Sequence, residues 1–160
     1  MIVSFFESFK YIGHLLPVAF LRIFIGYYFV NSASKRSESR FLEQPQLAEL
    51  INEWVPMSIA PELIKDFLQD FVVAYWQIFA HIITYSEYIV GIGFIIGFLV
   101  RPLSVLGVSI VVFFMFISNP ADILVYKLFI AVFFTLSWLG AGRCMGVDYF
   151  FFKRHRGIWW

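Results

Sequence analysis

Four long apolar stretches constrain this sequence more than any other feature. They cover residues 12–33, 71–100, 103–118 and 123–141. A helix rises about 1.5 Å per residue, so about 20 apolar residues cross the hydrocarbon core of a bilayer. A soluble domain has about 25% charged residues, whereas this chain has 14% charged and 61% hydrophobic residues. The sequence therefore predicts an integral membrane protein with four transmembrane helices.

The connections between the last three stretches are short. Pro102 suits the first turn of a helix, and the run Asn119-Pro120-Ala121-Asp122 is typical of a tight turn. Short connections make consecutive helices antiparallel. The expected fold class is an all-α integral membrane protein, an antiparallel four-transmembrane-helix bundle that forms one domain over residues 1–160.

The polar segment 34–70 interrupts this pattern. It contains three prolines, and its apolar residues recur near the helical period in two runs. These runs are Leu42, Leu47, Leu50, Ile51 and Trp54, and then Leu63, Ile64, Phe67, Leu68 and Phe71. We therefore expect two short amphipathic helices that lie on the membrane surface or cap the bundle.

The basic residues favour one orientation in the membrane. Four spans place both termini on one side, which then holds six basic and two acidic residues outside the spans. The opposite side holds five basic and eight acidic residues. Basic loops stay in the cytoplasm, and the basic, aromatic tail 149–160 suits an anionic inner leaflet. The prediction is a multi-pass protein of the cell (inner) membrane with cytoplasmic termini and an outer segment 34–70.

Two charged residues lie inside the predicted spans, Arg22 in the first and Glu87 in the second. A charge at the centre of an inserted helix costs about 3 kcal/mol. Both residues lie near mid-depth on antiparallel helices, so we expect them to pair. Such a pair either fixes helix packing or forms one wall of a polar pocket, and in the second case Arg22 and Glu87 are the candidate catalytic residues.

A polar stripe follows the second span at spacings of three and four, through Gln77, His81, Thr84 or Tyr85, and Tyr88. Histidine can bond a quinone carbonyl or accept a quinol proton. Gln77, His81, Tyr85 and Tyr88 are therefore the candidate residues of a quinone site. The alternative is that His81 is an interfacial histidine bonded to water or a neighbouring helix.

Other cofactors have little support in the sequence. Cys144 is the single cysteine, and no cluster of metal ligands stands out, so we expect neither a metal site nor a covalently bound cofactor. Gly91, Gly93 and Gly97 suit close helix packing. The tail 149–160 is interpreted as a membrane anchor, with no nucleic-acid partner.

Three parts of the chain resemble the DoxX/DoxD-like membrane proteins. The first is Arg22-Ile23-Phe24-Ile25-Gly26, and the second is Glu87-Tyr88-Ile89-Val90-Gly91-Ile92-Gly93-Phe94 with the later Gly97-Phe98-Leu99-Val100-Arg101-Pro102. The third is Gly140-Ala141-Gly142-Arg143 with Gly146-Val147-Asp148. The resemblance covers most of the chain except residues 38–71.

The resemblance implies a four-helical membrane subunit. DoxD-like members are the small membrane subunit of a thiosulfate:quinone oxidoreductase, so it implies a quinone-linked redox role that could involve sulfur-compound oxidation. The chain lacks a redox cofactor motif, which favours a subunit over a self-sufficient enzyme. The alternative is a non-catalytic accessory or scaffold subunit of a larger membrane complex. In both cases the expected partners are membrane lipid and other membrane-protein subunits.

Overall fold

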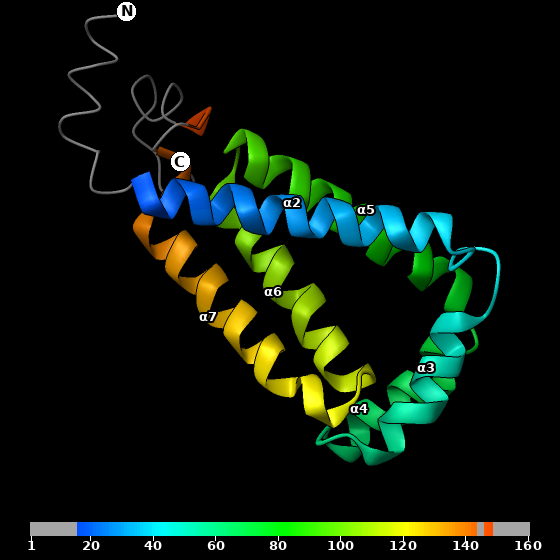
Figure 1. Ribbon diagram of the computed structural model, residues 1–160. Helices are drawn as coiled ribbons and strands as arrows, with labels where there is room; N and C mark the ends of the chain where they lie inside the picture. Colours follow the sequence, from blue (N-terminus) through cyan, green and yellow to red (C-terminus); the bar gives the residue numbers. More distant parts are fainter. Residues whose placement is uncertain (1–15, 144–145, 149–160) are drawn as a thin grey trace, which may run out of the picture.

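The computed structural model describes residues 16–143 and 146–148, and its elements within these ranges are all helical (Figure 1). Four helices are long and apolar enough to cross a membrane. They are α2 (Leu16–Glu38), α5 (Trp76–Ile96), α6 (Val100–Ile117) and α7 (Ile123–Leu139), with the short 3-10 helix η4 (Pro120–Asp122) before α7. The all-α fold with four membrane-spanning helices is therefore confirmed.

The helix ends differ from the apolar stretches in two places. α2 continues past Ala33 to Glu38, because residues 34–38 contain no proline or glycine that would stop a helix. α5 ends at Ile96 because Gly97 takes a positive φ of 72° and donates its N–H to the Gly93 carbonyl at 2.8 Å. Gly97 thus terminates α5 and is also closely packed, since a Cβ there would meet the Arg22 side chain of α2 and the Gly146 backbone.

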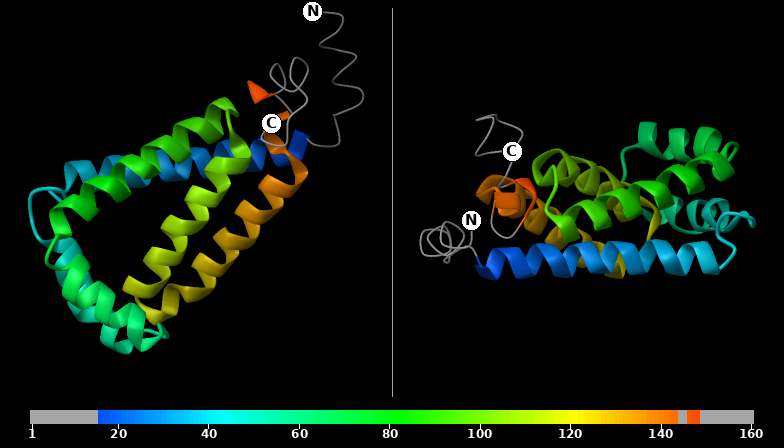
Figure 2. Two further views of the ribbon diagram at one scale, coloured as in Figure 1. Left: turned by 180° about the vertical axis from the view of Figure 1, so that it is seen from behind. Right: turned by 90° about the horizontal axis from the view of Figure 1, so that it is seen from above.

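The four long helices form two pairs that diverge (Figures 1 and 2). α2 lies beside α5, and α6 lies beside α7. The pairs meet at the end that holds Leu16 and the segment 146–148, and they spread apart toward the other end. We call these the closed end and the open end. At the closed end, Phe133 of α7 makes edge contacts with Phe29 of α2 and Phe94 of α5, at centroid distances of 5.4 and 5.3 Å.

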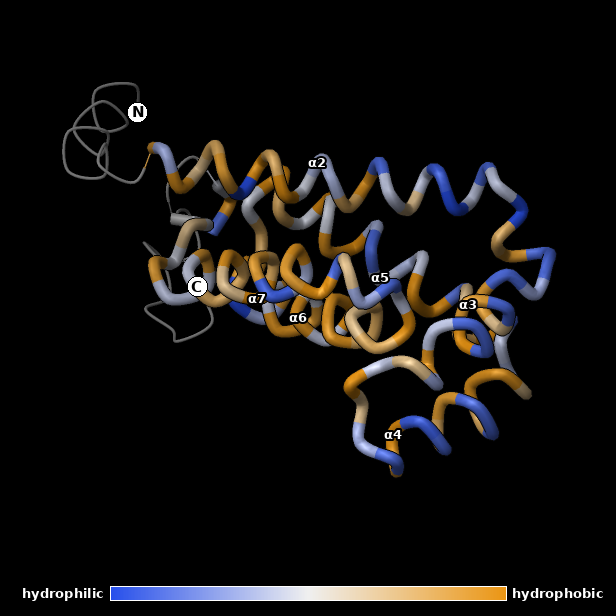
Figure 3. Tube along the Cα trace, turned by 60° about the horizontal axis from the view of Figure 1, so that its bottom comes forward, coloured by the Kyte–Doolittle hydropathy of each residue, from blue (hydrophilic) through white to orange (hydrophobic). Residues whose placement is uncertain are grey.

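Four short helical segments lie across the open end (Figure 1). They are α3 (Gln46–Trp54), η2 (Val55–Met57), α4 (Glu62–Asp66) and the one-turn π-helix η3 (Phe67–Val72). Leu47 and Ile51 of α3 are fully buried in the same apolar core as Val72 of η3. The predicted amphipathic helices therefore exist, and α3 buries its apolar face between the diverging pairs. In Figure 3 this region alternates between polar and apolar residues, whereas α6 and α7 are mostly apolar.

Close contact between α2 and α5 depends on two glycines. A Cβ on Gly91 would lie 2.8 Å from the Gly26 carbonyl oxygen, and a Cβ on Gly26 would lie 2.7 Å from the Gly91 carbonyl oxygen. Small residues at such a crossing let the two backbones approach. The contact sets the register of the antiparallel pair, and this register decides which polar side chains can meet.

Candidate functional site

Arg22 lies in a polar cluster at the closed end of the bundle. Its side chain is fully buried, and its Nη1 donates to the Ala141 carbonyl oxygen at 2.7 Å. A Cβ on Gly97 would lie 2.6 Å from this Nη1, and a Cβ on Gly146 would lie 2.8 Å from it. The guanidinium therefore occupies the space that side chains at these two glycines would need.

Asp148 joins the same cluster from the segment after α7. Its Oδ1 accepts the Leu99 N–H at 2.7 Å, and its Oδ2 accepts the Val100 N–H at 3.1 Å. Both donors belong to the start of α6, whose free N–H groups favour an anionic partner. The Asp148 N–H donates in turn to the Gly97 carbonyl at 3.0 Å. Asp148 thus caps α6 and ties the segment after α7 to the α5–α6 turn.

The closed-end cluster unites three parts of the sequence that are far apart. They are the start of α2 with Arg22, the α5–α6 turn at Gly97, and the segment from Ala141 to Asp148. The contacts therefore bring an arginine, two glycines and an aspartate together at one point of the bundle.

The predicted pairing of Arg22 with Glu87 is wrong. The Arg22 guanidinium lies beside Gly97, and Glu87 lies ten residues earlier along the chain, which corresponds to about 15 Å on a helix. Arg22 is held at the closed end. A pocket wall built from this pair does not form.

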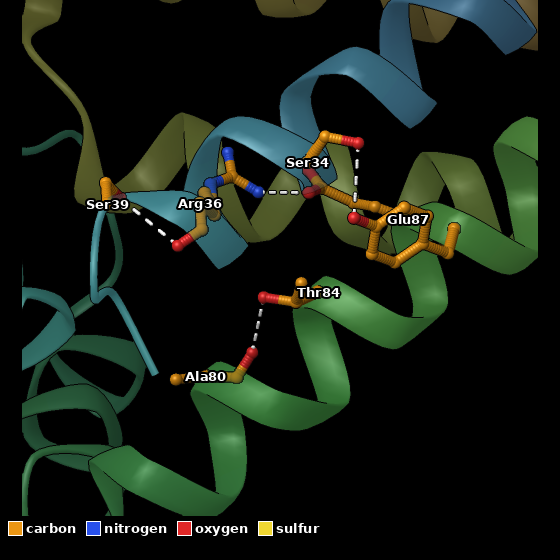
Figure 4. A network of polar contacts seen from close by, with 7 residues as sticks. Ser34, Arg36, Ser39, Ala80, Thr84 and Glu87 are labelled. Atoms are coloured by element: carbon orange, nitrogen blue, oxygen red, sulfur yellow. Dashed lines mark hydrogen bonds and ion pairs between the residues drawn. The ribbon is translucent and has the colours of Figure 1, made fainter. Parts of the chain in front are cut away.

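Glu87 instead forms an ion pair with Arg36, near the end of α2 (Figure 4). Glu87 is buried, while the Arg36 side chain remains 23% exposed. The guanidinium carbon of Arg36 lies 4.1 Å from the ring centroid of Phe114 in α6 and 5.7 Å from that of Phe41. A cation over an aromatic face is stabilised electrostatically. Arg36 therefore links α2, α5, α6 and the chain after α2 at one point.

Further polar groups surround this pair. The Tyr88 hydroxyl donates to Ser34 Oγ at 3.2 Å, which gives α2 and α5 a second polar contact. The buried Thr84 hydroxyl donates to the Ala80 carbonyl at 2.8 Å within α5 (Figure 4). We call the group of Arg36, Glu87, Tyr88 and Ser34 the open-end cluster.

The polar stripe predicted on α5 is divided. Gln77 and Tyr85 are exposed and His81 is partly buried, but Tyr88 turns toward Ser34. The reason is that Ser34 lies only four residues before the end of α2, so α2 covers Tyr88 but does not reach Gln77. Glu87 lies six residues after His81, which is about 120° around the helix. The stripe therefore does not lead to Glu87.

His81 has a defined ring orientation on the exposed face of α5. Its Nδ1 lies 2.8 Å from the Gln77 carbonyl oxygen. A carbonyl only accepts, so Nδ1 carries the proton and Nε2 is the ring nitrogen left for another partner. The Tyr85 ring lies next to it, at a centroid distance of 6.2 Å.

Sequence reasoning missed Arg36 because it placed this residue in the polar outer segment. The contact between Gly26 and Gly91 is the feature that could have indicated the pairing of Glu87 with Arg36, because it sets the register of α2 against α5. Gly91 lies against Gly26 and Val30 of the antiparallel α2, so Glu87, one turn earlier on α5, falls opposite a part of α2 that comes after Val30 and is closer to Arg36 than to Arg22. A long arginine side chain covers the remaining distance. No group of three or more His, Cys, Asp or Glu side chains that could hold a metal ion occurs in residues 16–143 and 146–148.

The fold, with four helices long and apolar enough to cross a membrane, defines a class, the all-α multi-pass membrane proteins. No family model, no curated protein and no solved structure matches this chain.

Proposed function

We propose that this chain is the membrane subunit of a quinone-linked oxidoreductase of the DoxD-like type, with a partner subunit as the source of electrons. The observation that carries the proposal is the pair His81 and Tyr85 on the exposed face of α5. His81 donates its Nδ1–H to the Gln77 carbonyl, so its Nε2 can accept a hydrogen bond from a quinol hydroxyl or, once protonated, donate one to a quinone carbonyl. The adjacent Tyr85 ring offers an apolar surface to a quinone ring.

The exposure of this pair explains why a partner subunit is needed. Gln77 and Tyr85 are exposed and His81 is only partly buried, whereas ligand sites usually bury most of a small ligand's surface. A partner that covers α5 would complete the site at the interface. Histidine takes up and releases a proton near neutral pH, so His81 would exchange protons with the quinone oxygen while the partner supplies electrons.

Photolabelling tests this proposal directly. The purified protein in nanodiscs is irradiated with an azido-quinone, and the labelled peptides are mapped by mass spectrometry. We expect adducts on α5 between Gln77 and Tyr85, with a large loss in His81→Leu. Tyr27→Phe is the matched control, because Tyr27 is an exposed aromatic residue on α2. Labelling that is spread over the exposed aromatic residues regardless of His81 would refute the quinone site.

A second candidate function, a non-catalytic accessory subunit, is favoured by α7. Only 11% of the most apolar part of the span Pro120–Leu139, which contains α7, is buried inside the protein, compared with 33–39% in the other three spans. Phe134 and Trp138 are exposed and stack at a centroid distance of 6.0 Å. Under this alternative, photocrosslinkers at these two positions yield one defined protein in stoichiometric amount, while the azido-quinone labels no specific site.

We further propose the inner membrane as the location, with both termini in the cytoplasm. The support is the excess of acidic residues in the segment between α2 and α5 and the basic residues near the chain ends. The tail 149–160, interpreted above as an anchor, lies outside the described residues.

A further inference from the structure

The segment from Glu62 to Tyr75 has three distinct faces. One face is packed into the protein and contains Ile64, Leu68 and Val72. The second face is exposed and acidic, with Glu62, Asp66 and Asp70. The third face is exposed and apolar, with Leu63, Phe67, Phe71 and Tyr75. Each face repeats every four residues, so the division follows from helical geometry.

The apolar face, which we call the aromatic stripe (Leu63, Phe67, Phe71 and Tyr75), is continuous. Phe67 stacks on Phe71 at a centroid distance of 5.3 Å, and Phe71 contacts Tyr75 at 5.2 Å. Leu63 at its beginning is 84% exposed. A soluble protein rarely leaves such a contiguous apolar patch in water, so another apolar medium is expected to cover it.

Two observations identify that medium as lipid. First, the stripe adjoins the membrane-spanning helix α5: Phe71 contacts the partly buried Phe79 at 5.9 Å, and Ile78, Ile82 and Ile89 of the same helix are exposed. Second, α3 and α4 lie across the open ends of the four spans, where a bilayer ends (Figures 1 and 2). Aromatic residues with adjacent charges are typical of helices in the membrane interface.

We propose that α4 and η3 form an interfacial helix in the leaflet opposite the termini, with the aromatic stripe in lipid and the acidic face in water. The inference is independent of the quinone proposal, because it involves neither His81 nor a partner subunit. The structure also corrects the sequence pattern here. Ile64 and Leu68 face the protein, whereas Leu63 and Phe67, from the same apolar run, face outward.

Spin labelling in liposomes tests the proposal. Single cysteines are introduced at Leu63 and Phe67, and at the matched acidic positions Glu62 and Asp66, in a background with Cys144→Ser. Each nitroxide is then exposed to oxygen, which concentrates in lipid, and to a water-soluble nickel chelate. We expect the ratio of oxygen to nickel collision rates to be high at residues 63 and 67 and low at residues 62 and 66.

Two results would overturn the proposal. Low ratios at all four positions would mean that the stripe lies in water. Protection of residues 63 and 67 from both reagents would mean that a second copy or another protein covers the stripe. All four positions are exposed, so labels there should leave the fold intact, and circular dichroism verifies this. Asp70 and Phe71 repeat the comparison one turn later if one variant fails to fold.

Discussion

At the scale of single residues, the buried charges are held by partners from different elements. Arg22 donates to a backbone carbonyl beyond α7, and Glu87 pairs with Arg36 from the end of α2. A buried charge without such a partner is costly in a low-dielectric interior. Each charge therefore fixes how its helix is positioned against a neighbouring element, which apolar contacts alone would fix less precisely.

The first prediction is that Glu87 is energetically coupled to Arg36 and not to Arg22. In a double-mutant cycle of Glu87→Gln and Arg36→Gln, we expect a coupling energy of about 0.5–3 kcal/mol, since the two side chains are in contact. The free energy of unfolding is measured by SDS titration in mixed micelles.

The cycle of Glu87→Gln with Arg22→Gln is the control. These sites are about 15 Å apart, so their effects should add within about 0.5 kcal/mol. Additive effects in the Arg36 cycle, together with coupling in the Arg22 cycle, would contradict the observed pairing.

At the scale of helices, the register between α2 and α5 determines which side chains can meet. The Gly26–Gly91 contact brings the two backbones together. Tyr88 then reaches Ser34, and Glu87 reaches Arg36. A change in this contact should therefore disturb the open-end cluster as well as the local packing.

The second prediction concerns Gly91→Ala. The added methyl would meet the Gly26 carbonyl oxygen and the Val30 side chain. Overpacking costs about 1–3 kcal/mol, whereas alanine gains about 1 kcal/mol in helix propensity. We expect a net loss of up to about 2 kcal/mol in the free energy of unfolding, measured by the same titration.

Gly93→Ala is the matched substitution on the same helix. Its methyl would meet the end of the Leu103 side chain, which can rotate away. This variant should be less destabilised than Gly91→Ala. An equal or larger loss for Gly93→Ala would show that α2 and α5 do not approach as closely as described.

At the scale of the whole molecule, the closed end holds the chain together. The segment after α7 returns to the α5–α6 turn through Asp148, and Arg22 brings in α2. At the open end, α3 and its neighbours pack between the diverging helix pairs. Polar contacts thus fasten the closed end, whereas the open end combines the open-end cluster with the apolar packing of α3.

The third prediction is that Asp148→Ala weakens the start of α6. Loss of the cap leaves the N–H groups of Leu99 and Val100 without their carboxylate and should cost about 0.5–2 kcal/mol. Faster hydrogen exchange in the peptide containing these amides is the specific readout. Asp122→Asn is the control, because Asp122 precedes α7 without a side-chain cap bond. Unchanged exchange in Asp148→Ala would disprove the capping role.

The fourth prediction is the orientation of the whole protein. Glu49 is exposed on α3, so a cysteine there, in a Cys144→Ser background, should react with a membrane-impermeant maleimide added to intact spheroplasts. Labelling that requires permeabilisation would place α3 in the cytoplasm and reverse the proposed topology.

The sequence by itself determined the fold class, the four spans and the existence of amphipathic segments, because hydropathy and helical periodicity are properties of neighbouring residues. Only the tertiary structure decided the partner of Glu87, the position of Arg22 beside Gly97, and the separation of Tyr88 from His81. These depend on helix register and on where α2 ends. A shift of one helical turn moves a side chain by about 5.4 Å along its neighbour, which is enough to change the partner of a charge without changing any hydropathy pattern.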